Sequence, residues 1–174
     1  MTSVQLFSEH MLRFFSMAAI VLAGLLMLEC RSGRAVLAVS ELPDYNKQSA
    51  DHIIFLNFRI TGKPGGNERV ELASANVGDG KMKDISRPVH SPYQIKAVPR
   101  YKTSAIEREM VFEHPLLRNA EVSDPGGHIR QVEATASEGS LLVRLQQHAG
   151  LNQLELFSVS PESGTVKIYT LDFK

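Results

Sequence analysis

The cations of one stretch, between residues 81 and 102, carry the most suggestive chemistry in the chain. Six cations stand there against one acid, Asp84, giving a net charge of +5, and two tyrosines lie among them. Cations beside aromatic rings suit an anionic glycan, an anionic lipid surface or another protein of the cell envelope with an acidic face. The candidate binding residues are Lys81, Lys83, Arg87, Tyr93, Lys96, Arg100, Tyr101 and Lys102.

The same cations have a second interpretation that needs no ligand. Lys and Arg on an edge strand prevent strands of neighbouring molecules from pairing. Glu107, Glu109 and Glu113 follow the stretch and would neutralise it if the two segments paired. The whole chain has 19 basic and 19 acidic residues, a formal net charge of zero. This balance argues against a nucleic-acid partner, because such binding depends on neutralising phosphates.

Catalytic motifs are missing from the sequence. It has no Gly-x-Ser-x-Gly elbow, no phosphate loop ending in Gly-Lys-Ser/Thr and no His-Glu-x-x-His helix motif. Ser140 and Ser163 lie beside glycines, where turn formation explains them. We therefore predict a protein that is not an enzyme and has no catalytic residues, with a hydrolase of unrecognised site as an alternative.

Metal ligands are equally sparse. His114, His128 and Asp124 would form a metal site only if their loops converged, since zinc ligands normally stand closer in sequence. Asp79 and Asp84 are interleaved with lysines and offer too few oxygens for calcium. We predict no metal and no cofactor.

A hydrophobic leader opens the chain. Phe14 to Leu28 form a run of 15 residues without a charge, preceded by Arg13. A membrane-spanning helix usually needs about 20 apolar residues, so this run is typical of a secretory signal. A small-residue cleavage pattern ends at Ala38. Residues 1–38 are thus predicted to be a signal peptide or signal anchor, and the protein to be exported to the periplasm, the cell surface or the medium.

Two details of the leader stay open. Met11 is an alternative start, because Met-Leu-Arg directly precedes the apolar run. Cys30, the only cysteine, would be acylated in a lipoprotein, although Glu29 stands where that pattern has a small residue. In either case we expect membrane contact only through the leader.

The remaining chain alternates apolar and polar residues in short runs separated by turns, which is typical of strands. Residues 39–51 are polar and predict a linker without structure of its own, so the domain is expected to span residues 52–174. In its first run, Ile54, Leu56, Phe58 and Ile60 share one face.

Turn residues predict two hairpins. Gly62 to Gly66 would join the first two strands, and Ser160 to Gly164 the last two. Asp124 to Gly127 forms a third turn. Pro99 predicts an edge or bulged strand, because proline cannot donate to a ladder. Residues 114–120 are ambiguous between a turn and a single helical turn.

These runs amount to seven or eight strands with no helix to cover them, so we predict an all-β, two-sheet antiparallel β-sandwich behind a signal helix. The strand rhythm of His52 to Lys174 resembles the immunoglobulin-like and fibronectin-like modules of exported bacterial proteins, without their tryptophan and paired cysteines. A small closed barrel is the alternative fold.

The leading functional hypothesis is a non-catalytic binding or interaction module of the cell envelope. The second is a small-ligand-binding β-barrel, because apolar residues occupy both faces of some runs, as at Phe55 with Leu56 and Leu141 with Leu142.

Overall fold

A computed structural model describes residues 33–62, 68–83, 88–103, 109–123 and 126–174, apart from the side chains of residues 118–121 and 130–134. The predicted leader up to residue 32, which includes Cys30, lies outside these residues. The folded unit is Ser32–Lys174.

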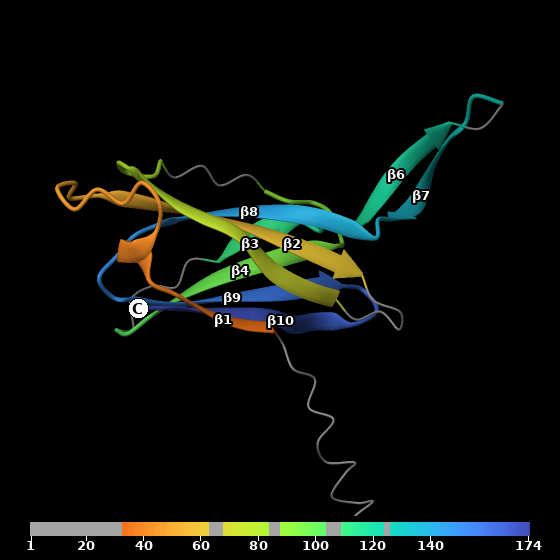
Figure 1. Ribbon diagram of the computed structural model, residues 1–174. Helices are drawn as coiled ribbons and strands as arrows, with labels where there is room; N and C mark the ends of the chain where they lie inside the picture. The colour runs from red at the N-terminus through yellow and green to blue at the C-terminus, as the bar shows by residue number, and fades with distance from the viewer. Residues whose placement is uncertain (1–32, 63–67, 84–87, 104–108, 124–125) are drawn as a thin grey trace, which may run out of the picture. The chain divides into compact units, whose positions relative to one another are not determined.

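Strands dominate the described residues, which confirms the predicted all-β class (Figure 1). The strands are β1 (Gly33–Leu37), β2 (His52–Gly62), β3 (Glu68–Asp79), β4 (Gln94–Tyr101), β5 (Met110–Glu113), β6 (Leu117–Ser123), β7 (Ile129–Thr135), β8 (Glu138–Gln146), β9 (Leu151–Ser160) and β10 (Gly164–Phe173). The described residues thus form ten strands, where seven or eight were predicted. The additional ones include β1, in the residues assigned to the leader, and β6, which runs through the ambiguous segment 114–120.

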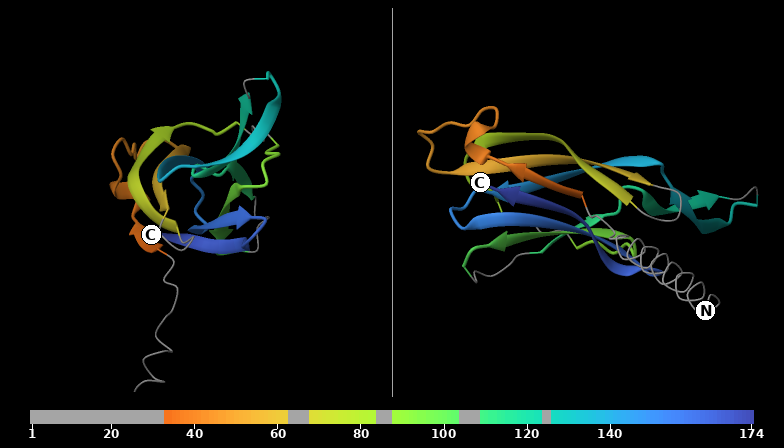
Figure 2. Two further views of the ribbon diagram at one scale, coloured as in Figure 1. Left: turned by 90° about the vertical axis from the view of Figure 1, so that its right-hand side faces the viewer. Right: turned by 60° about the horizontal axis from the view of Figure 1, so that its bottom comes forward.

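Two sheets face one another across the core. One has five strands in the order β1-β10-β9-β4-β5, and the other has three in the order β3-β2-β8. Figure 2 shows the two layers, which agree with a sandwich. β6 and β7 form a separate two-stranded sheet and, among the described strands, pair with each other alone. All strand pairs are antiparallel except β1 with β10, which is parallel and departs from the purely antiparallel prediction.

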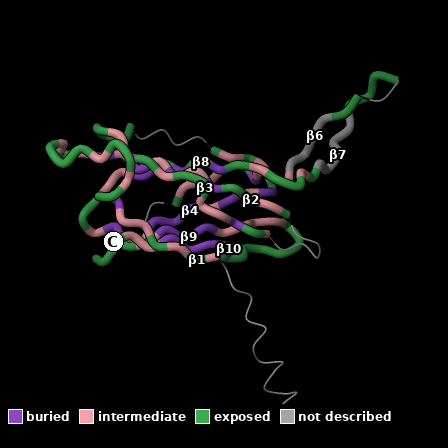
Figure 3. The backbone as a smooth tube through the Cα atoms, viewed as in Figure 1, coloured by how far each residue is buried: buried purple, intermediate pink, exposed green. Residues whose placement is uncertain are grey.

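The core lies between the two main sheets, as the buried segments in Figure 3 show. The predicted inward face of β2 is confirmed, since Ile54, Leu56, Phe58 and Ile60 are each 0% exposed. Their partners on the five-stranded sheet include Ile95, Ala97, Leu154, Leu156 and Leu171, also at 0%. Each such large side chain contributes roughly 2 kcal/mol through burial.

Both predicted hairpins form. β2 pairs with β3, and β9 with β10, in antiparallel register. β10 carries a bulge between Lys167 and Tyr169. One extra residue changes which side chains face outward. Lys167 therefore faces outward before the bulge and Thr170 faces outward after it.

Pro99 lies where β4 becomes an edge. β4 pairs with β9 along its whole length, but the pairing of β5 with β4 ends at Ala97. A missing N–H is tolerated at such a position. β4 is therefore an interior strand at its start and an edge, within the described residues, around Pro99.

The segment 39–51 belongs to the folded unit and packs against the core. Val39, in the 3-10 helix η1 (Val39–Glu41), is buried, and Leu42 packs against the core. Tyr45 stacks on His52 with ring centroids 4.5 Å apart. The apolar side chains among these polar residues explain the packing, which the turn residues alone did not predict.

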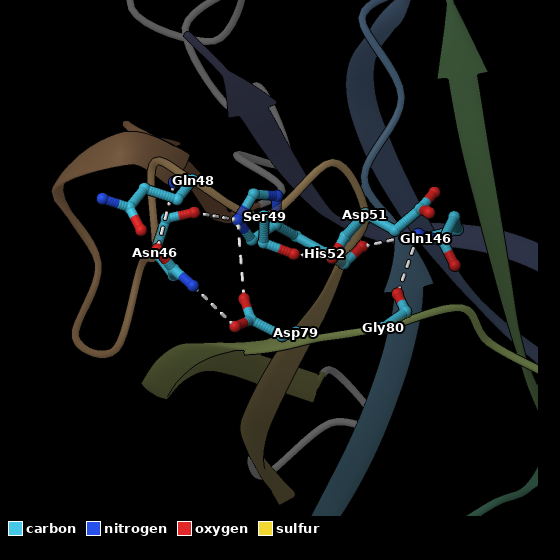
Figure 4. A network of polar contacts seen from close by, with 8 residues as sticks. All are labelled: Asn46, Gln48, Ser49, Asp51, His52, Asp79, Gly80 and Gln146. Carbon is cyan, nitrogen blue, oxygen red and sulfur yellow. Dashed lines mark hydrogen bonds and ion pairs between the residues drawn. The ribbon is translucent and has the colours of Figure 1, made fainter.

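Polar contacts hold the same segment to the ends of β2 and β3, and Gln146 joins the end of β8 to them (Figure 4). Asn46 O lies 2.8 Å from Nε2 of His52, and Asn46 Nδ2 donates to Asp79 at 2.9 Å. Gln146 Nε2 donates to His52 O at 2.8 Å and to Gly80 O at 3.3 Å. This network closes one end of the sandwich.

Candidate binding surface

The outer face of the five-stranded sheet brings charged and aromatic side chains into rows. β4, β9 and β10 lie side by side, and their register aligns residues that alternate with the buried ones. One row consists of Lys96, Phe157 and Lys167, and the next of Val98, Glu155 and Thr170. We call this face the outer ladder.

A shallow groove of about 280 Å³ runs over the outer ladder. Its lining combines cations, one acid, two apolar side chains and a hydroxyl: Lys96, Val98, Arg100, Glu109, Phe157 and Thr165. Cations beside a partly exposed ring can hold an acidic group and pack against an apolar or sugar surface.

Glu155 organises the cations of the outer ladder. Arg100 Nε donates to Glu155 Oε2 at 2.7 Å, and Lys167 Nζ donates to Glu155 Oε1 at 3.1 Å. The Glu155 side chain is only 12% exposed. Two cations thus share one buried carboxylate, which fixes their positions and leaves one positive charge in excess.

The pKa of Glu155 reflects this arrangement. Burial acts to raise it, but the hydrogen bonds and charges of Arg100 and Lys167 outweigh burial and lower the pKa from its ordinary 4.5. The carboxylate is therefore ionised at neutral pH. It anchors the two cations as a charged group.

Lys96 is the third cation of the outer ladder, beside Arg100 and Lys167. Its Nζ lies 2.9 Å from Glu109 Oε1, and this acid is 44% exposed. Ion pairs with exposed acids contribute little and exchange readily with solvent. Lys96 can therefore leave Glu109 for an incoming anion more easily than Arg100 can leave Glu155.

A second polar contact continues the outer ladder toward β1. Arg34 Nε donates to Asp172 Oδ2 at 2.7 Å, and Gln153 Nε2 donates to Asp172 Oδ1 at 2.8 Å. These two hydrogen bonds lower the pKa of Asp172 from its ordinary 3.8.

The structure places only some of the eight candidate binding residues at the groove. Lys96 and Arg100 both lie on the outer ladder and line the groove. Tyr93 is buried and its hydroxyl lies 3.5 Å from Glu162 Oε1. Tyr101 packs against the core, and burial raises its pKa.

The other candidate cations lie away from the groove. Lys81 follows β3 of the other sheet and pairs with Asp51 at 3.5 Å. Lys83 is exposed in the following loop, and Lys102 is exposed at the end of β4. Arg87 lies outside the described residues. Of the acids expected to neutralise the stretch, Glu109 does pair with Lys96.

Phe157, Lys167 and Glu155 were not among the sequence candidates. They come from the last hairpin, more than 50 residues after Lys96 and Arg100, and only the strand order β10-β9-β4 brings them there. The one available signal was Glu155, an acid within the apolar run 151–159, which implied a paired carboxylate.

A buried cluster of His114, Glu68 and Ser158 contains the residue types of a nucleophilic triad. His114 Nδ1 accepts the backbone N–H groups of Leu116 and Leu117 at 3.1 and 3.2 Å. Its ring proton is therefore on Nε2, which donates to Glu68 Oε1 at 3.0 Å. The Ser158 hydroxyl donates to the same oxygen at 2.9 Å.

This geometry differs from that of a triad. An activated serine donates to a free histidine nitrogen, while the carboxylate holds the other nitrogen. Here Ser158 Oγ lies 3.3 Å from His114 Nε2, but Nε2 and the Ser158 hydroxyl both donate to Glu68 Oε1, and backbone amides occupy Nδ1, the second histidine nitrogen. The cluster joins β3 and β9 to the segment between β5 and β6.

The described residues hold no group of three His, Cys, Asp or Glu suited to a metal ion. His114 is buried in the cluster above, whereas His128 is exposed in the β6–β7 turn. Asp124 and Asp84 lie outside the described residues. Asp79 instead accepts from Asn46 at 2.9 Å.

In the part of the chain that the structure describes, no helix has the length and apolar character to cross a membrane. Comparison with known proteins found no matching family model, no similar curated protein and no similar solved structure.

Proposed function

We propose that this protein is an exported, non-catalytic binding module of the cell envelope that holds an anionic partner on its outer ladder. The observation that carries the proposal is the pair of cations, Arg100 and Lys167, held by one buried carboxylate beside Lys96 and Phe157. Fixed cations lose little conformational freedom on binding, which favours affinity.

The sequence and the buried cluster support a binding role without catalysis. The chain lacks the common nucleophile and phosphate-loop motifs, and the His114 nitrogen that could accept a serine proton is occupied by backbone amides. The strand rhythm and the two facing sheets support membership of the immunoglobulin-like or fibronectin-like sandwich modules.

The chemistry of the partner follows from the groove. It is an acidic group carried by a glycan, a lipid surface or another envelope protein, and it displaces Glu109 from Lys96. Salt should weaken this contact, because Lys96, Arg100 and Lys167 of the outer ladder are between 30% and 46% exposed.

The test compares two double variants with the same change in charge. Lys96→Gln with Lys167→Gln removes two cations of the outer ladder and keeps the Arg100–Glu155 pair. Arg59→Gln with Lys47→Gln removes two exposed cations elsewhere. Arg100→Glu is avoided, because it would place a second carboxylate beside Glu155.

Binding is measured at low and physiological salt to an acidic polysaccharide, to vesicles with anionic lipid and to an acidic protein. We expect at least one probe to bind with salt-sensitive affinity, and the Lys96/Lys167 variant to lose about tenfold or more. The control variant should bind as the wild type does. Equal losses in both variants, or no salt-sensitive binding, would reject the proposed site.

Export is tested separately by fractionating cells that express the full chain. We expect the protein in the envelope or the medium, because the leader resembles a secretory signal. Recovery of the intact chain in the cytosol would refute export and would leave the binding measurement unaffected.

A further inference from the structure

β1 (Gly33–Leu37) pairs with β10 over its whole length, although it overlaps the predicted leader. Its five residues align in parallel register from Gly33 with Tyr169 to Leu37 with Phe173. The chain terminus adds a further hydrogen bond, from Lys174 N–H to Leu37 O at 3.0 Å.

The side chains of β1 fit their places in the sheet. Ala35 and Leu37 face inward and pack against the core. Arg34 faces outward and bonds Asp172 at 2.7 Å. Alternation of this kind is expected of a strand that belongs to the fold.

Gly33 gives the most specific observation. A Cβ at this position would lie 2.7 Å from Cδ2 of Tyr169 and 3.2 Å from the backbone oxygen of Val70. Tyr169 is itself buried and packs edge-on against Phe58 at 5.5 Å. Glycine is therefore required for β1 to approach the sandwich this closely.

β1 also covers an edge that would otherwise be open. It ends the order β1-β10-β9-β4-β5, so its loss would leave β10 as an edge strand of ten residues. Long unpaired edges invite pairing between molecules and aggregation. The sandwich therefore needs a strand in this place.

We infer that Gly33–Leu37 is a strand of the finished protein, so that any removal of N-terminal residues ends before Gly33. The small-residue pattern ending at Ala38 is then not the processing site, because cutting after Ala38 would detach β1 from the chain. This inference does not need the proposed binding function or export.

The first test maps the N-terminus of the full chain recovered from expressing cells by intact mass and N-terminal sequencing. A product that begins at or before Gly33, whether uncleaved, cut upstream or acylated at Cys30, supports the inference. A product that begins at Val39 overturns it.

A second test replaces Ala38 with Gln, which would block cleavage after this position because such sites need a small residue. We expect the same N-terminus as in the wild type. Accumulation of a longer product in this variant alone would overturn the inference, whatever the stability of the fold.

A third test compares Gly33→Val with Val36→Thr, a control at an outward position that is 54% exposed. We expect Gly33→Val to lower the melting temperature of the recovered protein by about 5 °C or more, because overpacking is destabilising. Val36→Thr should change it by about 1 °C or less. Wild-type mass and melting temperature for the Gly33→Val product would show that residue 33 had been removed.

Discussion

The outer faces of the two main sheets both carry ion pairs, but these pairs differ in how far they are buried. On the five-stranded sheet, Arg100 and Lys167 bond Glu155, whose side chain is 12% exposed. On the three-stranded sheet, Arg59 pairs with Glu138 at 3.2 Å, and the two side chains are 55% and 59% exposed. An ion pair fixes the position of a cation only where the acid is itself held in place.

One apolar residue on each face shows the same difference in burial. Val98 of the outer ladder is only 8% exposed, whereas Leu142 of β8 is 55% exposed. Val98 is aligned with Glu155 of β9 and lines the groove together with Lys96 and Arg100. The side chains around Glu155 on the wider sheet are thus more buried than Arg59, Glu138 and Leu142 on the narrower sheet.

The largest expected effect comes from removing the shared acid. Glu155→Gln should lower the free energy of unfolding by about 2 kcal/mol, because two charged hydrogen bonds lose their ionised acceptor. The matched variant Glu138→Gln should change it by about 0.5 kcal/mol or less, since exposed pairs contribute little. Urea unfolding at neutral pH measures both.

Equal destabilisation by these two variants would contradict the difference between the two faces, because it would mean that the exposed Arg59–Glu138 pair stabilises the fold as much as Glu155 does. A loss confined to Glu155→Gln would show that the outer ladder is a fixed arrangement of charges.

A smaller effect is expected from the apolar residues of the two faces. Val98→Ala removes buried surface and should cost about 1.5 kcal/mol, whereas Leu142→Ala should cost about 0.5 kcal/mol or less. The same unfolding experiment checks both. A greater loss for Leu142→Ala would place Leu142 in a contact that its exposure does not indicate.

Much of the fold could be predicted because period-two alternation reports directly on burial. Ile54, Leu56, Phe58 and Ile60 were assigned to one face from spacing alone, and all four are buried. The turn at Ser160 to Gly164 likewise fixed the last hairpin. Strand order was beyond this reasoning, since pairing between distant strands leaves no local pattern.

The candidate surface shows the same limit. Lys96 and Arg100 could be found because they belong to the basic stretch between residues 81 and 102. They lie two residues on either side of Val98 in one strand and therefore share its face. Lys167 and Glu155 join them through the register of β10 with β9 and of β9 with β4. The bulge after Lys167 further alters which side chains face outward. β1 was not predicted, because its residues closely follow the apolar run and were assigned to the leader.

The smallest expected effect is a change in the pH dependence of stability. The pKa of Glu155 is lowered by Arg100 and Lys167 in the folded state. Its contribution is therefore fully present above its ordinary pKa of 4.5 and is lost as the pH falls through the lower, folded value. Asp172, whose pKa is lowered by Arg34 and Gln153, contributes with the same sign at lower pH.

Unfolding curves measured between about pH 6 and about pH 3 should thus show wild-type stability falling with acidification. Glu155→Gln should show a slightly shallower fall, because the group that takes up the proton is gone, and the difference between its stability and that of the wild type should narrow towards the acid end. Glu138→Gln keeps Glu155 and should keep the wild-type slope. A steeper fall in Glu155→Gln than in the wild type would mean that burial, and not the two cations, dominates the ionisation of Glu155.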